Sequence, residues 1–243
     1  MIDPVLLAAA RISTFHHRQL LTRATGFFFR RDHRLFLVTS RHVMINEATG
    51  HRPNRIEITI HTDRSNMATG TGYSIPLYYD GRRQWRQAVD CAGDVDVAVI
   101  EIDQTALPTT FVYAAFTPDH LTVPFTQIEI GSSLLVVGYP LGFHDSLHHM
   151  PVARYAIVAS SFGLRFQGMG YFLTDARTHR GISGAPVVMR LPKEYAPLDD
   201  LPWILLGIHS AKLEVDNREI NVDEALGLNV AWYADILLTL TNS

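Results

Sequence analysis

The chain has 243 residues, of which 47% are hydrophobic and 19% charged, so it has enough apolar mass for a sizeable folded core. Its formal net charge of −3 and pI near 6.4 leave no basic surplus, which argues against nucleic acid as a partner. Cys91 is the only cysteine, which excludes an intramolecular disulfide and a cysteine-rich zinc site and suits a reducing compartment.

The N-terminus carries a short apolar run, residues 5–10, with no basic region ahead of it and an acid at Asp3. We therefore predict no secretory signal. No stretch approaches the roughly 18 uninterrupted apolar residues that a membrane-spanning helix needs. We expect a soluble cytoplasmic protein that does not act at a membrane, and no motif in the chain indicates a cofactor.

Short runs rich in Val, Ile, Phe and Tyr recur along the chain. Clusters of Gly, Pro, Asp or Asn separate most of them, a pattern typical of antiparallel strands in a sandwich or barrel. The sequence therefore predicts an all-β fold. The predicted strands are 26–29, 35–39, 56–61, 95–102, 133–138, 153–160, 171–174, 185–189, 204–209 and 226–230.

Helical signals are few. We predict one turn after His42 and a helix in the tail, where Tyr233, Ile236, Leu237 and Leu240 follow the spacing i, i+3, i+4, i+7.

A connection between two halves is predicted in the stretch 108–124, which has no clean periodicity and contains three prolines. We place the boundary near residue 115, which gives the units 1–115 and 116–243. Residues 191–202, with three prolines and two consecutive aspartates, predict a long surface hairpin loop.

Three segments carry residues suited to acyl transfer. An apolar strand ends just before His42, a second apolar strand opens with Asp96, and a glycine-flanked turn surrounds Ser183. A serine hydroxyl is a poor nucleophile and needs a base within reach, an acid that orients the base, and donors for the oxyanion. Taken singly, each segment also fits ordinary structure: a satisfied histidine, a capping aspartate and a turn serine.

The order and context of the three segments resemble the trypsin-like peptidase superfamily. Its members carry a histidine after a strand, an Asp-x-Ala strand and Gly-x-Ser-Gly-x-Pro, in the order found here. The resemblance covers about residues 24–238 and implies two six-stranded β-barrels, a cleft between them and a C-terminal helix. It further implies a serine endopeptidase acting on a protein or peptide substrate.

Carried over by residue, the resemblance makes His42 the general base, Asp96 the orienting acid and Ser183 the nucleophile. Asp94 is the rival orienting acid, but Asp96 is followed directly by the apolar strand as in the family pattern. The backbone amides of Gly181 and Ser183 would form the oxyanion hole, and a side chain at Gly181 would crowd the developing anion.

Bacterial members are the more similar ones. Residues 136–142 look like the Gly-x-Pro-x-Gly segment of heat-shock-type bacterial peptidases, and residues 173–176 like their Thr-Asp-Ala strand. Ile182 stands where zymogen-activated relatives have an aspartate that pairs with a freshly cut N-terminus. The sequence thus gives no support to activation by N-terminal cleavage.

The primary specificity pocket of this fold is lined by residues before the serine and by the strand after it. Thr178 and His209 resemble the pair that binds an acidic side chain in glutamyl endopeptidases. Hydroxyl and imidazole donors suit a carboxylate, which predicts cleavage after Glu or Asp. The alternative is that His209 is a core histidine and Thr178 a turn residue.

Three further positions belong to the predicted substrate-binding strand: Ser210, Ala211 and Lys212. Glutamyl members of the family have an aromatic residue and glycines there. Lys212 could fold across the mouth of the pocket.

His144, His148 and His149 raise the question of a metal site, because His144 and His148 have i, i+4 spacing. Only Asp145 is near as an acidic ligand, so we expect a solvated loop and no metal.

Two other functions stay open: a catalytically silent trypsin fold that serves as a binding module, and a protease that a regulatory partner activates. An α/β-hydrolase esterase is set aside, because its triad runs Ser, Asp, His along the chain.

Overall fold

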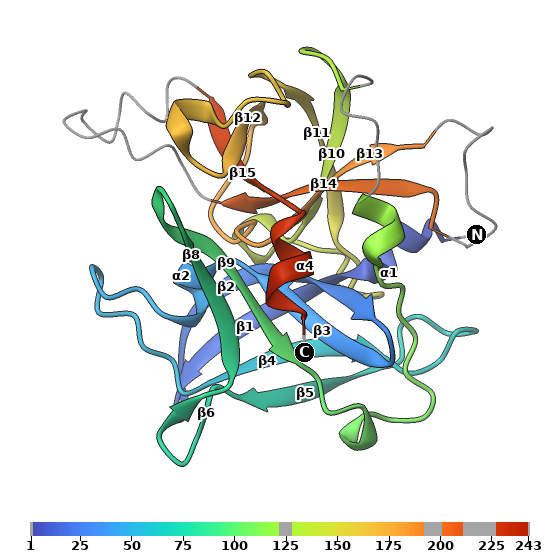
Figure 1. The fold of residues 1–243 in the computed structure, drawn as a ribbon. Coiled ribbons are helices and arrows are strands. Elements are labelled where there is room, and N and C mark those ends of the chain that lie inside the picture. Colours follow the sequence, from blue (N-terminus) through green and yellow to red (C-terminus); the bar gives the residue numbers. More distant parts are fainter. Residues whose placement is uncertain (1, 122–127, 192–200, 211–226, 243) are drawn as a thin grey trace.

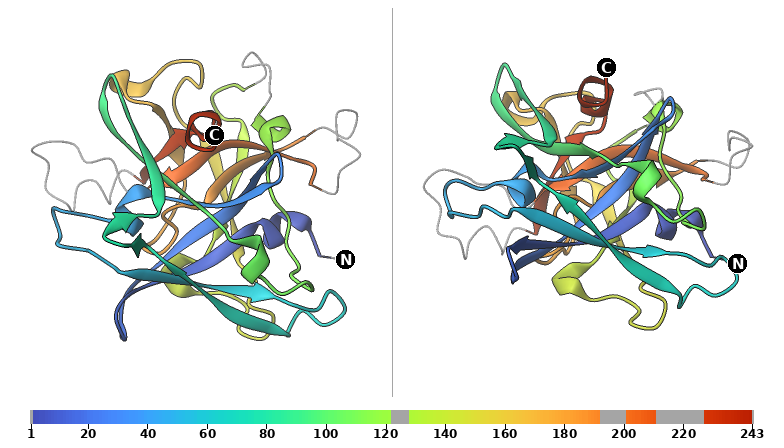
Figure 2. Two further views of the ribbon diagram at one scale, coloured as in Figure 1. Left: turned by 60° about the horizontal axis from the view of Figure 1, so that its bottom comes forward. Right: turned by 90° about the horizontal axis from the view of Figure 1, so that it is seen from below.

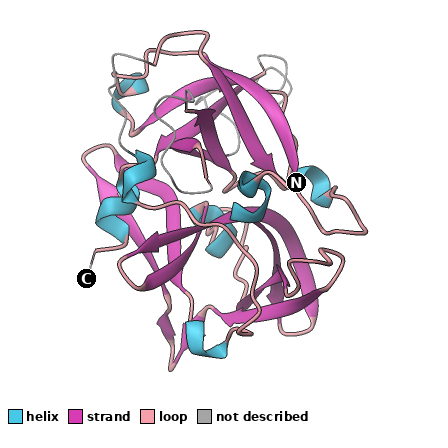
Figure 3. Ribbon diagram, turned by 90° about the vertical axis from the view of Figure 1, so that its right-hand side faces the viewer, coloured by secondary structure: helices cyan, strands magenta, loops and turns pink. Residues whose placement is uncertain are grey.

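The computed structural model describes residues 2–121, 128–191, 201–210 and 227–242. Strands dominate these residues, and helices are few and short (Figure 3). The first half contains α1 (Pro4–Ala8), β1 (Ala9–His16), β2 (Gln19–Arg31), β3 (Arg34–Thr39), α2 (Arg41–Met44), β4 (Arg55–His61), β5 (Gly70–Pro76), β6 (Tyr78–Tyr79), β7 (Arg82–Arg83), β8 (Trp85–Asp90) and β9 (Gly93–Glu101).

The second half contains β10 (Ser133–Gly138), β11 (Val152–Val158), β12 (Tyr171–Asp175), β13 (Pro186–Arg190), β14 (Trp203–Ser210), β15 (Leu228–Tyr233) and α4 (Ile236–Leu240). Short 3₁₀ turns lie at Gln104–Ala106, Pro118–Leu121, Pro140–Gly142 and Phe166–Gly168. No helix in the described part of the chain combines the length and apolar character that crossing a bilayer requires.

The predicted all-β fold is confirmed, and the two halves are visible in Figure 1. The second half is a closed barrel in the order β10-β11-β12-β15-β14-β13, as expected. The first half differs in detail from a six-stranded barrel, because it forms a seven-stranded sheet in the order β5-β4-β1-β2-β3-β9-β8.

Three strands of this sheet, β1, β5 and β8, were not among those predicted. Their residues are a mixture of small, polar and charged types, such as Gly-Thr-Gly-Tyr-Ser-Ile-Pro in β5, and several are exposed. Pairing with apolar neighbours, and not the strands' own hydrophobic pattern, places them in the sheet.

The two halves share one hydrophobic core. Phe27, Phe29 and Phe36 of the sheet pack in the same cluster as Val188 and Trp232 of the barrel. Each half also has a core of its own. This shared core fixes the seam at which β2, β3 and β9 meet the barrel.

The boundary at residue 115 stays a prediction. Phe116 pairs with β2, through bonds from its N–H to the Phe28 carbonyl and from the Arg30 N–H to its own carbonyl. The chain therefore leaves the first sheet after this residue, between β9 and β10.

The tail helix is shorter than predicted, because Tyr233 still belongs to β15 and only Ile236–Leu240 is helical. Leu237 and Leu240 are buried. In Figures 1 and 2, α4 lies beside β8 and β9 of the other half. Arg34 and Arg86 donate hydrogen bonds to backbone carbonyls at the end of the chain, which secures this crossing.

Candidate active site

His42 and Asp96 are brought together by two neighbouring elements of the first half. His42 lies in α2, one turn beyond the end of β3, and Asp96 lies in β9, which pairs with β3. The Nδ1 atom of His42 is 2.7 Å from Oδ2 of Asp96, and the backbone N–H of His42 donates to Oδ1 at 2.8 Å. Both carboxylate oxygens of Asp96 therefore hold the histidine.

A third donor reaches Asp96 from the barrel, the hydroxyl of Ser210 at 2.5 Å from Oδ2. Burial by itself would raise the pKa of Asp96, but hydrogen bonds from the His42 ring, Ser210 and the His42 N–H outweigh it and lower the pKa. The carboxylate is thus ionised at neutral pH. It accepts the Nδ1 proton of His42 and leaves Nε2 with its lone pair.

The rival acid, Asp94, lies apart from His42. Its Oδ2 atom is 3.3 Å from a guanidinium nitrogen of Arg41, and just over half of its side chain is exposed. Because β9 alternates its side chains between two faces, Asp94 and Asp96 share a face; Asp94 pairs with Arg41 of α2, whereas Asp96 bonds to His42.

The turn that carries Ser183 has four successive carbonyls anchored. The carbonyl of Arg180 accepts from Leu141 N–H at 2.5 Å and that of Gly181 from the Thr25 hydroxyl at 2.8 Å. The carbonyl of Ile182 accepts from Ala185 N–H, and that of Ser183 from Thr25 N–H, each at 3.0 Å. The peptides of this turn are trans, since no cis peptide occurs in the described residues, so each following N–H points away from its anchored carbonyl.

Glycine is required on both sides of the serine. Gly181 and Gly184 have φ angles of +93° and +85°, in the region that favours glycine. A Cβ at Gly184 would lie 2.2 Å from Oγ1 of Thr39 and 2.3 Å from the carbonyl oxygen of Thr25. The turn is therefore pressed directly against β2 and β3 of the other half.

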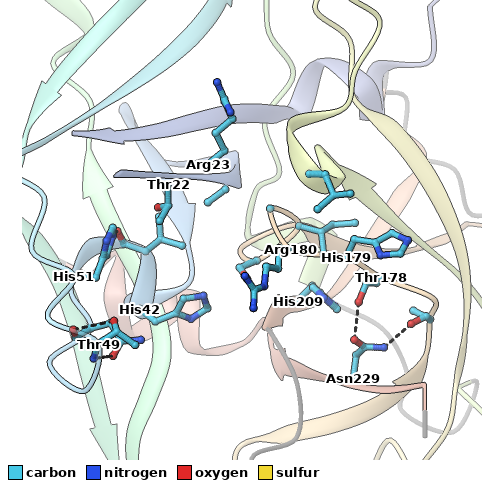
Figure 4. Close-up of a pocket in the computed structure, with 18 of the residues that line it drawn as sticks. Thr22, Arg23, His42, Thr49, His51, Thr178, His179, Arg180, His209 and Asn229 are labelled. Atoms are coloured by element: carbon cyan, nitrogen blue, oxygen red, sulfur yellow. Dashed lines mark hydrogen bonds between the residues drawn. The ribbon is translucent and has the colours of Figure 1, made fainter. Parts of the chain in front are cut away.

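One cleft is lined by several of the predicted groups, although Asp96 is not among its lining residues. Its lining includes His42, Gly181, Ser183, Thr178 and His209. In Figure 4, Arg180 lies between His42 and His209, and Thr178 and Asn229 lie beyond His209. The cleft thus joins the His42 side to the predicted primary pocket.

The predicted primary pocket contains a residue that the sequence did not single out, Asn229 of β15. The hydroxyl of Thr178 donates to Oδ1 of Asn229 at 2.6 Å, and Nδ2 of Asn229 donates to the Ala176 carbonyl at 2.5 Å (Figure 4). Nothing in the strand pattern of residues 226–230 marks this asparagine, because its role depends on the pairing of β15 with β12.

His209 is only 1% exposed, and its Nδ1 atom has no hydrogen-bond partner among the described residues. Burial, followed by repulsion from His42, lowers the pKa of His209 to about 3. The imidazole is therefore neutral near pH 7 and can offer a carboxylate a polar contact but no charge.

Charge in the cleft comes from arginine instead. Among the described residues, four arginines line it against a single acid, Asp175. None of the four forms an ion pair with a carboxylate within the described ranges of the chain. They are Arg23, Arg154, Arg177 and Arg180.

Three further substrate-binding positions stay predictions: Ser210, Ala211 and Lys212. Ser210 turns its hydroxyl to Asp96 and is not part of the cleft lining. Ala211 and Lys212 lie outside the described residues.

The histidine cluster makes hydrogen bonds of its own. Nδ1 of His144 is 2.7 Å from the Gly142 carbonyl oxygen and its Nε2 is 3.1 Å from a nitrogen of Arg11. Nδ1 of His148 is 2.6 Å from Oδ2 of Asp145, and the rings of His144 and His149 stack. Among residues that the structure describes, no group of three or more side chains is placed to bind a metal.

Comparison with known proteins gives one family. A sequence profile of the trypsin-like peptidase domain matches residues 24–191. No curated protein matches the sequence significantly.

Solved structures show the same fold. The HtrA-type protease AlgW with a tripeptide is similar with a TM-score of 0.55 and 18% identity, over 97% of this chain and 59% of that one. A serine endoprotease from Yersinia pestis is similar with a TM-score of 0.54 and 16% identity, over 97% of this chain and 62% of that one. The active form of the Rv3671c protease from M. tuberculosis is similar with a TM-score of 0.50 and 18% identity, over 98% of this chain and 82% of that one. This chain thus spans about three fifths of the first two.

Proposed function

Because this chain belongs to the trypsin-like peptidase domain family, we propose that it is a serine endopeptidase with Ser183 as nucleophile, His42 as general base and Asp96 as orienting acid. The observation that carries the proposal is the His42–Asp96 pair, with Nδ1 and Oδ2 2.7 Å apart, in the cleft that also exposes Ser183. A protein or peptide is its substrate.

Each group has a defined task. Nε2 of His42 takes the proton from the Ser183 hydroxyl as Oγ bonds to the substrate carbonyl carbon. The N–H groups of Gly181 and Ser183 receive the oxyanion. His42 then gives the proton to the leaving nitrogen as the C–N bond breaks, and a water molecule hydrolyses the acyl-enzyme by the same route. Asp96, held ionised by three hydrogen bonds, stabilises the protonated imidazole.

The turn supports activity without a preceding rearrangement. Since Leu141 holds the Arg180 carbonyl, the N–H of Gly181 is directed away from Leu141. This geometry favours an enzyme that is active by itself over a silent fold or a partner-activated one. Ile182 is 1% exposed and sits in the barrel core, which agrees with a turn that needs no ion pair to form.

We propose that the primary pocket takes Glu or Asp. The four arginines of the cleft, which form no ion pair within the described residues, provide the positive potential that neutral His209 lacks. A bound carboxylate would displace the Thr178–Asn229 hydrogen bond to accept from the Thr178 hydroxyl. Opposite charge in a cleft raises the local concentration of an acidic substrate.

A reducing, cytoplasmic location is also proposed. The single thiol, Cys91, is free and exposed, which suits a compartment that keeps thiols reduced.

The test is digestion of a denatured protein by the purified chain and by its Ser183→Ala variant, with the cut sites identified by mass spectrometry. We expect cleavage by the first protein only, with Glu or Asp before the cut bonds. Equal cleavage by both would overturn the serine mechanism. Serine-dependent cleavage after other residues would overturn only the specificity. Activity that appears only with a partner would replace the constitutive enzyme by a partner-activated one.

A further inference from the structure

Thr25 of β2 lies in the seam between the two halves and is fully buried. Its hydroxyl donates to the Gly181 carbonyl at 2.8 Å and accepts from the N–H of Tyr139 at 3.0 Å. Its own N–H donates to the Ser183 carbonyl, and its carbonyl accepts from the Thr39 hydroxyl at 2.7 Å. Every polar group of Thr25 is thus engaged at the catalytic turn or next to it.

The direction of the hydroxyl bond is fixed by its neighbours. A backbone N–H can only donate, so the Thr25 oxygen must accept from Tyr139. Its single hydrogen is then available for one acceptor, the Gly181 carbonyl. Gly138 leaves room for this arrangement, since a Cβ there would lie 2.6 Å from Oγ1 and 2.9 Å from Cγ2 of Thr25.

Thr25 donates two of the four hydrogen bonds that hold the carbonyls of the nucleophile turn, residues 180–183. Its hydroxyl also accepts from Tyr139, next to the segment that donates a third. Tyr139 begins the short segment in which Leu141 holds the Arg180 carbonyl. The two peptide planes on either side of Gly181 are therefore fixed by Leu141 and by the Thr25 hydroxyl. Together they hold Gly181 at φ +93°.

Resting on the proposed function, we propose that Thr25 is a positioning residue of the reaction, which keeps the N–H of Gly181 aimed at the oxyanion. Glycine has wide conformational freedom, so loss of the Thr25 hydroxyl frees the Gly181–Ile182 peptide. The same loss removes the acceptor of the Tyr139 N–H and loosens the segment in which Leu141 holds the Arg180 carbonyl. The Arg180–Gly181 peptide, which carries the Gly181 N–H, can then turn. A misplacement of about 1 Å at a reacting group can cost roughly a hundredfold in rate.

The test compares Thr25→Val, which keeps the shape and removes the hydroxyl, with Thr25→Ser, which keeps the hydroxyl. Thr174→Val is the matched control, because Thr174 is also fully buried but its hydroxyl has no partner among the described residues and it does not line the cleft. Thermal unfolding sets a temperature at which all variants are folded. Thr25→Ala replaces the valine variant if that variant does not fold.

The readout is the rate at which a fluorophosphonate probe labels Ser183, where Oγ bonds to phosphorus, fluoride leaves and His42 takes the proton. We expect Thr25→Val to label roughly 10- to 100-fold more slowly, and Thr25→Ser and Thr174→Val to stay within about threefold of the parent. With a peptide substrate, Thr25→Val should lower kcat and leave KM within about twofold of the parent value.

Equal labelling of Thr25→Val and the parent would overturn the inference and leave the proposed function standing. If the parent itself is not labelled, the proposed function fails, and crystal structures decide the inference separately. A rotated Arg180–Gly181 peptide, with the Gly181 N–H turned out of the oxyanion hole in Thr25→Val alone, would support the positioning role. An unchanged turn in that variant would refute it.

Discussion

The nucleophile turn and the primary pocket are neighbours in one cleft, but their polar groups are held in different ways. In the turn, all four carbonyls from Arg180 to Ser183 have donors: Leu141 and Thr25 of the surrounding fold bind three, and Ala185 of the turn itself binds the Ile182 carbonyl. In the pocket, the Thr178 hydroxyl is bound to Asn229, and Nδ1 of His209 has no partner within the described residues. In the proposed enzyme, the fold would therefore hold the reacting groups, whereas a few side chains would set the selectivity.

Substitution at Asp96 should have the largest effect. Asp96→Asn replaces an acceptor by a donor facing Nδ1 of His42, which favours the wrong imidazole tautomer and should lower kcat roughly 10³- to 10⁴-fold. Asp94→Asn is the control and should stay within about twofold, because Asp94 pairs with Arg41. Steady-state kinetics of both variants would measure this, and similar losses in both would contradict the assignment.

Gly184→Ala tests how tightly the turn is pressed against the other half. The new Cβ would meet Thr39 and Thr25 at 2.2 and 2.3 Å while the backbone stays at φ +85°. We expect unfolding free energy to drop by about 2–4 kcal/mol, with loss of activity. Gly163→Ala is the control, since its Cβ would meet nothing within 4 Å and its φ is not positive. Denaturant unfolding would measure the free energy of unfolding of both variants. Equal stability of the two would contradict close packing of the turn against β2 and β3.

Burial of His209 should make the stability of the folded chain sensitive to acid. Burial lowers the pKa of His209 to about 3 from an ordinary 6.5, so the unfolded chain binds more protons between these values. Above pH 6.5 the imidazole is neutral in both the folded and the unfolded chain, so its burial costs no protonation energy. As the pH drops from 6.5 toward 3, the unfolded chain takes up the proton and the free energy of unfolding should fall. Asp96, with its pKa below the ordinary 3.8, also loses its contribution on acidification, but only below about pH 4.

The expected loss between pH 6.5 and 4 is a few kcal/mol, measured by urea unfolding at each pH. His209→Gln should flatten the dependence in that window and leave the part below pH 4. An unchanged slope in the variant would show that another group causes the loss.

Arg180→Gln should have the smallest effect, on selectivity alone. Arg180 forms no ion pair within the described residues, and its removal from the cleft should reduce the preference for Glu over Gln substrates roughly three- to fivefold and weaken the salt dependence of that preference. Arg83→Gln, which does not line the cleft, is the control. The ratio of kcat/KM for two peptides that differ only in Glu or Gln before the cut bond would measure this preference. An unchanged ratio in Arg180→Gln would show that Arg180 does not contribute to specificity.

The sequence predicted the all-β fold and the segments around His42, Asp96 and Ser183, because strand ends and glycine-flanked turns leave local patterns. It did not predict Thr25, Asn229 or the tie between Ser210 and Asp96. These depend on which strands face each other across the seam or the barrel. Likewise, the charge state of His209 follows from its burial, which its neighbours in sequence do not reveal.

The central claim, that the isolated chain acylates Ser183, is tested most directly with p-nitrophenyl acetate under rapid mixing. We predict a burst of nitrophenol close to one equivalent per chain, with the acetyl group mapped to Ser183 by peptide mass spectrometry and absent in Ser183→Ala. A linear release without a burst, equal in the chain and in the variant, would contradict the account.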